Sequence, residues 1–129
     1  MNNPASVKVL IIEDDRFLRE LMAEKLTVSG YTVVEGVDGE DGFAKIKSEN
    51  PSVVLLDLIL PGMDGFSILR ETRKIPQFAK TPIFVLSNLG QAEDIQRAVS
   101  LGATDYLIKA HFTPADIVTK LQELFPVKS

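Results

Sequence analysis

Short apolar runs alternate along the chain with longer segments in which apolar residues recur at helical spacing. Runs rich in Val, Ile and Leu with few polar interruptions are typical of strands that are buried on both faces. Strands are predicted over residues 7–12, 31–34, 52–57, 81–87 and 104–108. Helices are predicted over about 15–29, 38–50, 64–74 and 92–101, with a last helix that begins near Thr113.

The ends of these helices carry the residues that usually begin and stop helices. Asp15 and Asp38 are expected to cap the first two helices, and Pro114 suits the first turn of the last. Gly30 and Gly102 are expected to stop the first and fourth helices. The apolar stripes of the first and last helices are expected in the core: Phe17, Leu18, Leu21, Met22 and Leu26, then Ile117, Leu121 and Leu124.

This order of elements predicts one α/β domain. Strands that alternate with helices form a parallel sheet, because right-handed crossovers place helices on both of its faces. The expected fold is a five-stranded, flavodoxin-like, doubly wound (βα)5 sheet with strand order 2-1-3-4-5. It would occupy residues 7–126, with residues 1–6 as a short N-terminal leader.

Polar side chains follow the apolar runs at one end of the predicted sheet. Glu13 and Asp14 follow the first strand, Asp57 the third, Ser87 ends the fourth and Lys109 follows the fifth. Singly, each has an ordinary explanation as a helix-start acid, a turn or loop residue, or a surface lysine. Ligands of open parallel sheets bind at the carboxyl ends of the strands, where the strand order reverses. The joint placement therefore predicts a hard-cation site beside a reactive aspartate.

Composition narrows the classes of function. The chain has 129 residues, a net charge of −4 and no Cys, which leaves chemistry to oxygen and nitrogen groups. No short window is rich in Lys or Arg, so direct nucleic-acid binding is not expected. No signal-peptide pattern and no membrane span is recognisable, and a cytoplasmic protein is expected. His111, the only histidine, is expected on the surface.

Four sequence segments resemble a known family. Residues 9–15, 55–65, 85–87 and 105–109 are similar to the motifs of the receiver domain of two-component response regulators. The resemblance covers nearly the whole chain and is to the single-domain, chemotaxis-regulator-like type. It implies a phosphoacceptor that signals through protein contacts. Because Ser129 follows the last helix closely, a stand-alone receiver is expected.

The resemblance assigns a metal site and a reaction. Asp57 would accept a phosphoryl group from a histidine kinase or a phosphotransfer protein, with Mg²⁺ as the cofactor. Asp14 and Asp57 would bind the ion directly, Glu13 would do so through a water, and the backbone carbonyl of Ile59 would complete the protein ligands. The protein would not be an enzyme, but it would assist its own phosphorylation and dephosphorylation.

Three further residues would relay the modification. Lys109 would pair with one phosphoryl oxygen and Ser87 would donate a hydrogen bond to another. Tyr106 would swing inward when the Ser87 hydroxyl binds the phosphoryl group, unless it is simply an exposed strand residue. The fourth helix, fifth strand and fifth helix would form the output face for an unknown downstream protein.

Three residues depart from the family pattern, and one of them is Ile59, which is apolar where many relatives carry a polar or longer side chain. Ala110 follows Lys109 where the family usually has a proline reached through a cis bond, so either a strained bond is kept or this loop takes another path. Asn88 replaces a smaller residue and could narrow access to Asp57. Ala110 and Asn88 keep open a pseudo-receiver that acts as a constitutive interaction module. An N-terminal receiver excised from a larger regulator or kinase is a further alternative. A phosphohydrolase with an aspartyl intermediate is the weakest reading.

Overall fold

The predicted strands form one parallel sheet in the computed structural model, which describes residues 7–126. The strand order is β2-β1-β3-β4-β5, as the sequence predicted. The strands are β1 (Lys8–Ile12), β2 (Thr32–Gly36), β3 (Val53–Leu56), β4 (Ile83–Ser87) and β5 (Asp105–Ile108). The helices are α1 (Arg16–Val28), α2 (Gly39–Glu49), α3 (Gly65–Lys74), α4 (Ala92–Ser100) and α5 (Pro114–Leu124). The predicted leader of residues 1–6 lies outside the described residues.

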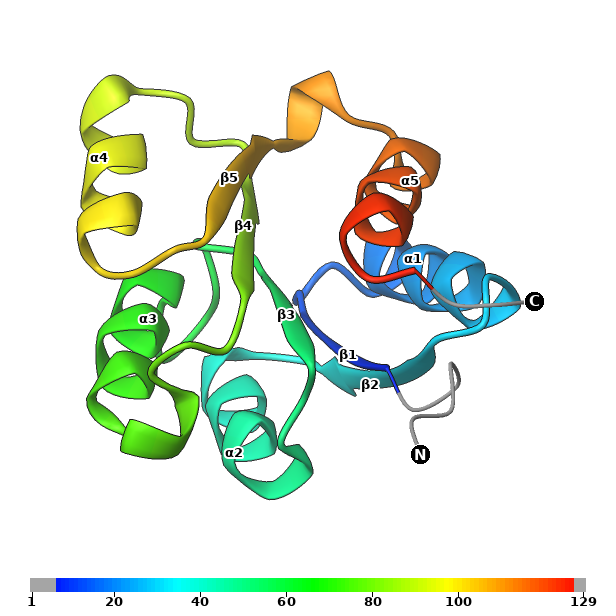
Figure 1. Cartoon of the computed structure of the whole chain (residues 1–129). Coiled ribbons are helices and arrows are strands. Elements are labelled where there is room, and N and C mark those ends of the chain that lie inside the picture. Colours follow the sequence, from blue (N-terminus) through cyan, green and yellow to red (C-terminus); the bar gives the residue numbers. More distant parts are fainter. Residues whose placement is uncertain (1–6, 127–129) are drawn as a thin grey trace.

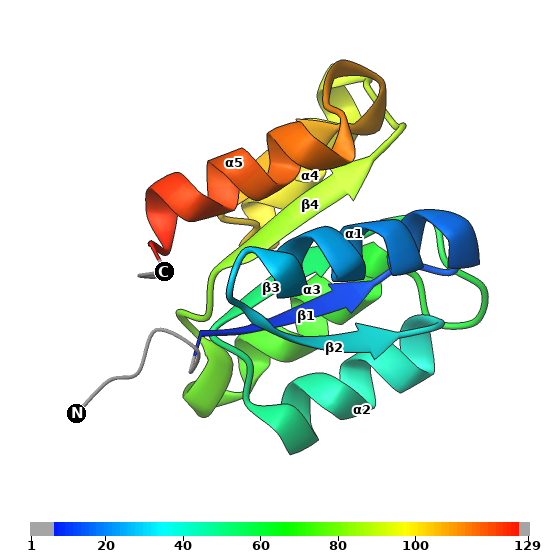
Figure 2. The ribbon, with the colours of Figure 1, turned by 90° about the vertical axis from the view of Figure 1, so that its right-hand side faces the viewer.

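The sheet separates two apolar cores. Helices α1 and α5 cover one face, and α2, α3 and α4 cover the other (Figures 1 and 2). Successive strand residues point to opposite faces, so Val9 and Ile11 of β1 enter the α1–α5 core while Leu10 and Ile12 enter the other. The central strands β3 and β4 are buried on both faces, as is β1 apart from Lys8, which explains their apolar runs; the edge strands β2 and β5 are less buried.

Side-chain caps fix where the helices begin. Asp15, Asp38 and Asp64 each accept a hydrogen bond from a backbone N–H in the first turn of α1, α2 and α3. Thr113 and Asp116 form a reciprocal capping box at α5. Because α1 begins immediately after its Asp15 cap, the residues between β1 and α1 are held at the carboxyl edge of the sheet.

The structure corrects the predicted core at two helix positions. Phe17 is 78% exposed and Leu124 is 51% exposed, although both share the spacing of the apolar stripes. Each lies near an end of its helix, and Met22, Leu26, Ile117 and Leu121 fill the core between α1, α5 and the sheet. Short 3₁₀ helices at Pro76–Phe78 (η2) and Lys109–His111 (η3) were not predicted, because so short an element has no periodicity to detect.

Gly42 of α2 packs directly against Ile12 of β1, and this close contact supports a prediction about stability. A methyl group on Gly42 would lie 2.5 Å from Ile12 Cγ2, inside a core without room to shift. We expect Gly42→Ala to lower the free energy of unfolding by about 1–2 kcal/mol, because overpacking outweighs the helical preference of alanine. Thermal melting followed by circular dichroism measures the change.

Gly90→Ala is the matched control, because a methyl group there would lie 3.7 Å from its nearest neighbour, Ile108 Cδ1. Its melting temperature should equal that of the wild type. Equal melting temperatures for Gly42→Ala and the wild type would contradict the close approach of α2.

Candidate functional site

Three carboxylates meet where β1 and β3 end. Glu13 follows β1, and Asp57 follows β3, whose backbone continues the ladder with a hydrogen bond from Asp57 N to the Ile12 carbonyl (3.0 Å). Carboxylate oxygens of Glu13, Asp14 and Asp57 all lie within 4.8 Å of one another. Glu13 and Asp57 are buried, whereas Asp14 is exposed. The structure therefore brings together the acids that the sequence placed at one sheet edge, with one side open to solvent.

Lys109 neutralises part of this acidic cluster. Its Nζ lies 2.6 Å from Glu13 Oε1 and 3.1 Å from Asp57 Oδ2. No peptide bond among residues 7–126 is cis, and Lys109 begins the helix η3. Of the two outcomes left open by Ala110, the loop takes the different path, and it still directs the ammonium group to the acids.

Burial controls the electrostatics of this cluster. It raises the pKa of Glu13 to about 7, repulsion from Asp57 adds to the rise, and the hydrogen bond from Lys109 opposes it. Burial of Lys109 favours the neutral amine, but its contacts with Glu13 and Asp57 outweigh this and raise the pKa of the ammonium. Lys109 therefore stays charged at neutral pH, and Glu13 is poised between its two protonation states.

Ser87 and Tyr106 hold the loop that follows β4. The backbone N–H of Leu89 donates to Ser87 Oγ (3.2 Å), and the Tyr106 hydroxyl donates to the Leu89 carbonyl (2.5 Å). The Tyr106 ring packs against the core on the α4 side, so it is half-buried and not the exposed residue of the alternative prediction. Burial raises the pKa of its hydroxyl, with a lowering contribution from a hydrogen bond with Ser87 and raising ones from Asp94 and Asp57. Both side chains thus meet at one residue of the loop that leads into α4.

Ile59 contributes its backbone to the site. Its N–H donates to Asp57 Oδ1 (3.2 Å), and its side chain is 58% exposed. The use of its carbonyl as a metal ligand stays a prediction. Asn88 is exposed on the loop after β4, and its predicted effect on access to Asp57 is likewise untested.

Arg19 supports the site in a way that the sequence reasoning missed. Its Nη1 donates to the Glu13 carbonyl (2.8 Å), and its Nε pairs with Glu35 Oε1 (3.1 Å). Only 8% of the residue is exposed. A signal existed, because Arg19 lies one turn before Met22 on the buried side of α1, where a charge needs a partner. Arg19 fixes the backbone that carries the first acid of the cluster.

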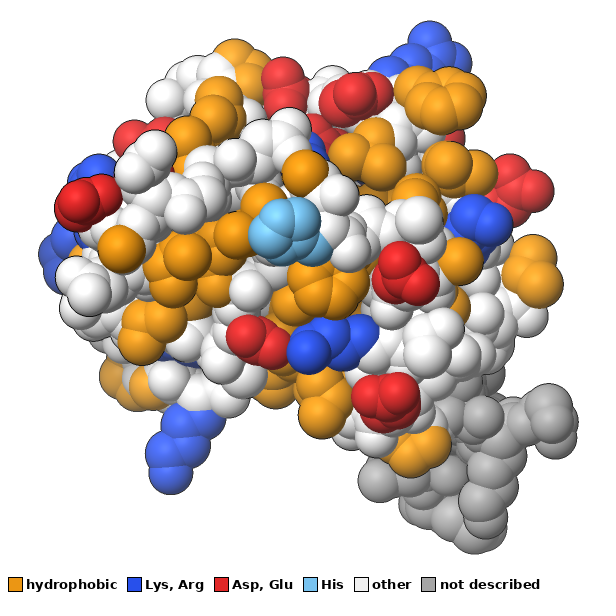
Figure 3. Space-filling model, turned by 90° about the horizontal axis from the view of Figure 1, so that it is seen from above, with side chains coloured by type: hydrophobic (Ala, Val, Ile, Leu, Met, Phe, Trp, Pro, Cys, Tyr) orange, Lys and Arg blue, Asp and Glu red, His pale blue; other side chains and the backbone are white. Residues whose placement is uncertain are grey.

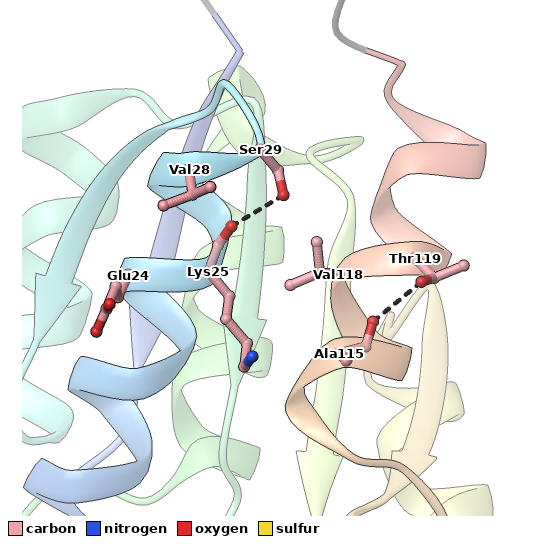
Figure 4. Close-up of a pocket in the computed structure, with 7 residues that line it drawn as sticks. All are labelled: Glu24, Lys25, Val28, Ser29, Ala115, Val118 and Thr119. Atoms are coloured by element: carbon pink, nitrogen blue, oxygen red, sulfur yellow. Dashed lines mark hydrogen bonds between the residues drawn. The ribbon is translucent and has the colours of Figure 1, made fainter.

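A surface groove lies away from the acidic cluster. The groove, of about 420 Å³, lies between α1 and α5, and its lining includes Lys25 and Ser29 of the α1 side and Val118 of α5 (Figure 4). None of the predicted site residues lines it. His111 is exposed, as predicted, with hydrophobic side chains around it on the surface seen in Figure 3. No helix in the described part of the chain has the length and apolar character that a membrane crossing requires.

The side chains present fit a magnesium ion. Mg²⁺ takes oxygen ligands and is usually held by one or two carboxylates together with waters and phosphate oxygens. Glu13, Asp14 and Asp57 supply such oxygens within reach of one another, and the site lacks the nitrogen and sulfur ligands that favour zinc. The neighbouring ammonium of Lys109 has no lone pair to offer and would not be a ligand of the ion.

Fold and site together define a doubly wound α/β domain with an acidic site at the point where the strand order reverses. The model of the response regulator receiver domain family matches residues 9–122. The chain belongs to this family, and it is the receiver domain of a two-component response regulator.

Relatives and solved structures agree with this assignment. The RpaA master transcriptional regulator of a Synechocystis species is 37% identical over 102 residues, which cover 79% of this chain and 42% of that protein. The probable transcriptional regulator ycf27 of Porphyridium aerugineum is 32% identical, over 91% of this chain and 47% of that protein. The chain thus spans about half the length of these curated relatives. The chemotaxis protein CheY4 of Vibrio cholerae superposes with a TM-score of 0.83 at 31% identity, covering 91% of this chain and 97% of that one.

Proposed function

We propose that Asp57 accepts a phosphoryl group from a histidine kinase or a phosphotransfer protein, with the help of Mg²⁺. The observation that carries the proposal is the pairing of one ammonium, that of Lys109, with both Asp57 and Glu13 beside a third carboxylate. An aspartate nucleophile needs such neutralisation, because the incoming phosphoryl group adds negative charge to an acidic site.

The reaction follows from the positions of these groups. An Asp57 oxygen forms a bond to phosphorus while the P–N bond of the phosphohistidine breaks, and the electron pair of that bond stays on the donor's nitrogen. Bound Mg²⁺ would supply positive charge to the phosphoryl oxygens. Asp14 and Asp57 would hold it directly, Glu13 through a water, and Ile59 through its carbonyl. Lys109 would move with the new charge, exchanging a carboxylate contact for a phosphoryl oxygen.

The signal would leave the site through the loop after β4. Ser87 would donate its hydroxyl to the phosphoryl group, and Leu89, which contacts both Ser87 and Tyr106, would change position with it. The face formed by α4, β5 and α5 would then bind a downstream protein. RpaA and ycf27 are named as transcriptional regulators, but this chain has a net charge of −4 and no short window rich in Lys or Arg, so we do not expect it to bind nucleic acid directly.

The role is that of a phosphoacceptor in the cytoplasm and not of an enzyme with a separate substrate. Each transfer consumes the Asp57 carboxylate, which returns when water hydrolyses the aspartyl phosphate. The Lys109 ammonium and the bound Mg²⁺ would assist both steps. The exposure of Asp14 suits this role, because it leaves one edge of the acidic cluster accessible to a partner's phosphohistidine.

Intact mass spectrometry after incubation with acetyl phosphate tests the proposal. Wild-type protein with Mg²⁺ should gain one phosphoryl group, whereas Asp57→Asn or wild type in the presence of EDTA should gain none. Asp57→Asn is the matched variant because it keeps the size of the side chain and removes the nucleophilic oxygen. If the wild type stays unmodified with Mg²⁺, including with a cognate kinase, the pseudo-receiver alternative replaces this proposal.

A further inference from the structure

The loop between β3 and α3 rests on the first turn of α2. Glu40 Oε2 accepts a hydrogen bond from the backbone N–H of Met63 (2.5 Å). A Cβ on Gly39 would lie 1.7 Å from the Met63 carbonyl oxygen, and a Cβ on Gly62, whose φ is +74°, would lie 2.0 Å from Glu40 Oε1. The two glycines therefore allow the loop to approach α2, and the Glu40 carboxylate connects the helix to the loop.

Glu40 and its neighbour Asp41 make different contacts. Asp41 Oδ2 accepts from Val37 N (2.9 Å) and pairs with Lys45 (3.1 Å), as an acid in the first turn of a helix commonly does. Glu40, in the same turn, extends across to the β3–α3 loop instead. Its contact is with another element and not with its own helix end.

The loop is fixed by a hydrogen bond on each side of Ile59. The first anchor is Leu58, which is buried and accepts a hydrogen bond at its carbonyl from Gly65 N (3.0 Å). The second is Met63, held by Glu40. Between them Ile59 donates its N–H to Asp57 Oδ1. The shape of this loop thus sets the position of the Ile59 backbone relative to the phosphoacceptor.

We propose that Glu40 is a positioning residue for the metal and phosphoryl site: it holds the β3–α3 loop so that the Ile59 backbone faces Asp57. The inference rests on the proposed function, because it concerns the use of this loop when Mg²⁺ binds. Groups that orient metal ligands without touching the metal commonly change metal affinity by about 10- to 100-fold when they are removed.

Two substitutions of Glu40 separate the hydrogen bond from the charge. Glu40→Gln keeps an oxygen acceptor for Met63 N and removes the charge, whereas Glu40→Ala removes both. Glu24→Ala removes an exposed acid from α1 and serves as the control. We expect Glu40→Ala to weaken Mg²⁺ binding, measured by isothermal titration calorimetry, about 10-fold. Glu40→Gln and Glu24→Ala should remain close to the wild type.

Hydrogen exchange of the Met63 amide gives a readout that needs no metal. In the absence of Mg²⁺ this amide should exchange faster in Glu40→Ala than in the wild type, and Glu40→Gln should restore protection. Gly62→Ala disturbs the contact from the loop side without removing the charge, because its methyl group would overlap the Glu40 carboxylate and its backbone would be strained at φ +74°. It should weaken Mg²⁺ binding in the same direction as Glu40→Ala.

The outcomes distinguish this inference from the proposed function. Equal weakening in Glu40→Gln and Glu40→Ala would mean that charge acts at a distance, and the positioning role would be wrong. Wild-type affinity in Glu40→Ala, with normal Mg²⁺ binding by the wild type, would overturn the inference and leave the proposed function intact. If the wild type binds no Mg²⁺, both are overturned together.

Discussion

Lys109→Met should slow phosphorylation of Asp57 by acetyl phosphate about 100-fold or more, because a preorganised charge at developing phosphoryl oxygens is worth that much. Methionine keeps an unbranched side chain of similar length and removes the ammonium that contacts Glu13 and Asp57. The measurement is the rate at which the phosphorylated mass appears at saturating Mg²⁺.

The same substitution should strengthen Mg²⁺ binding. The Lys109 ammonium forms ion pairs with two of the three carboxylates that would bind the ion. Its positive charge also repels a second cation nearby. Removing it therefore frees the oxygens and lowers the local positive charge. Calorimetric titration with Mg²⁺ should give a lower dissociation constant for Lys109→Met than for the wild type, although the variant is the slower phosphoacceptor.

The prediction is specific because Lys109→Met should slow phosphorylation and yet strengthen Mg²⁺ binding. A variant that was simply misfolded at the site would lose both metal binding and phosphorylation. Lys80→Met, which changes an exposed lysine just before β4, should alter neither quantity. Weaker Mg²⁺ binding by Lys109→Met would mean that the lysine orders the carboxylates for the ion and does not compete with it.

The gathering of the site residues at one edge of the sheet could be predicted, because strand direction alone determines it. Every strand in a parallel sheet ends on the same side, so residues that follow the apolar runs must gather there. Glu13, Asp57, Ser87 and Lys109 were found by this rule, and the distances among Glu13, Asp57 and Lys109 in the structure follow it. The strand order of a doubly wound fold then placed β1 beside β3.

The supporting contacts could not be predicted because they depend on how loops lie against other elements. Glu40 contacts Met63, which is 23 positions away in the sequence, and nothing in the α2 pattern distinguishes Glu40 from Asp41. Leu89 joins the site through its backbone, which carries no signal in the sequence. Phe17 was misplaced because helical spacing defines a face but not how far the neighbouring elements extend over it.

Magnesium should raise the melting temperature by several degrees, and more than NaCl at matched ionic strength. An ion that binds only the folded state stabilises it by about 2.7 kcal/mol when its concentration is a hundred times the dissociation constant. For a domain of this size each kcal/mol corresponds to a shift of roughly 3–6 °C, so that stabilisation would raise the melting temperature by about 8–16 °C. Asp14→Asn should lose most of the shift, whereas Glu123→Asn, at an exposed position near the end of α5, should keep it.

The magnesium effect should grow as pH rises from about 5.5 to 8, because Glu13 must be ionised to take part. Burial raises the pKa of its folded-state carboxyl from 4.5 to about 7, so the folded protein binds more protons than the unfolded chain between these values. Without metal, the contribution of Glu13 to stability therefore falls as pH rises through this window. With Mg²⁺, ionised Glu13 gains a cation and the loss is offset. A magnesium-induced shift in melting temperature that is the same at pH 5.5 and pH 8 would exclude Glu13 from the site, and no shift up to tens of millimolar Mg²⁺ would exclude the site itself.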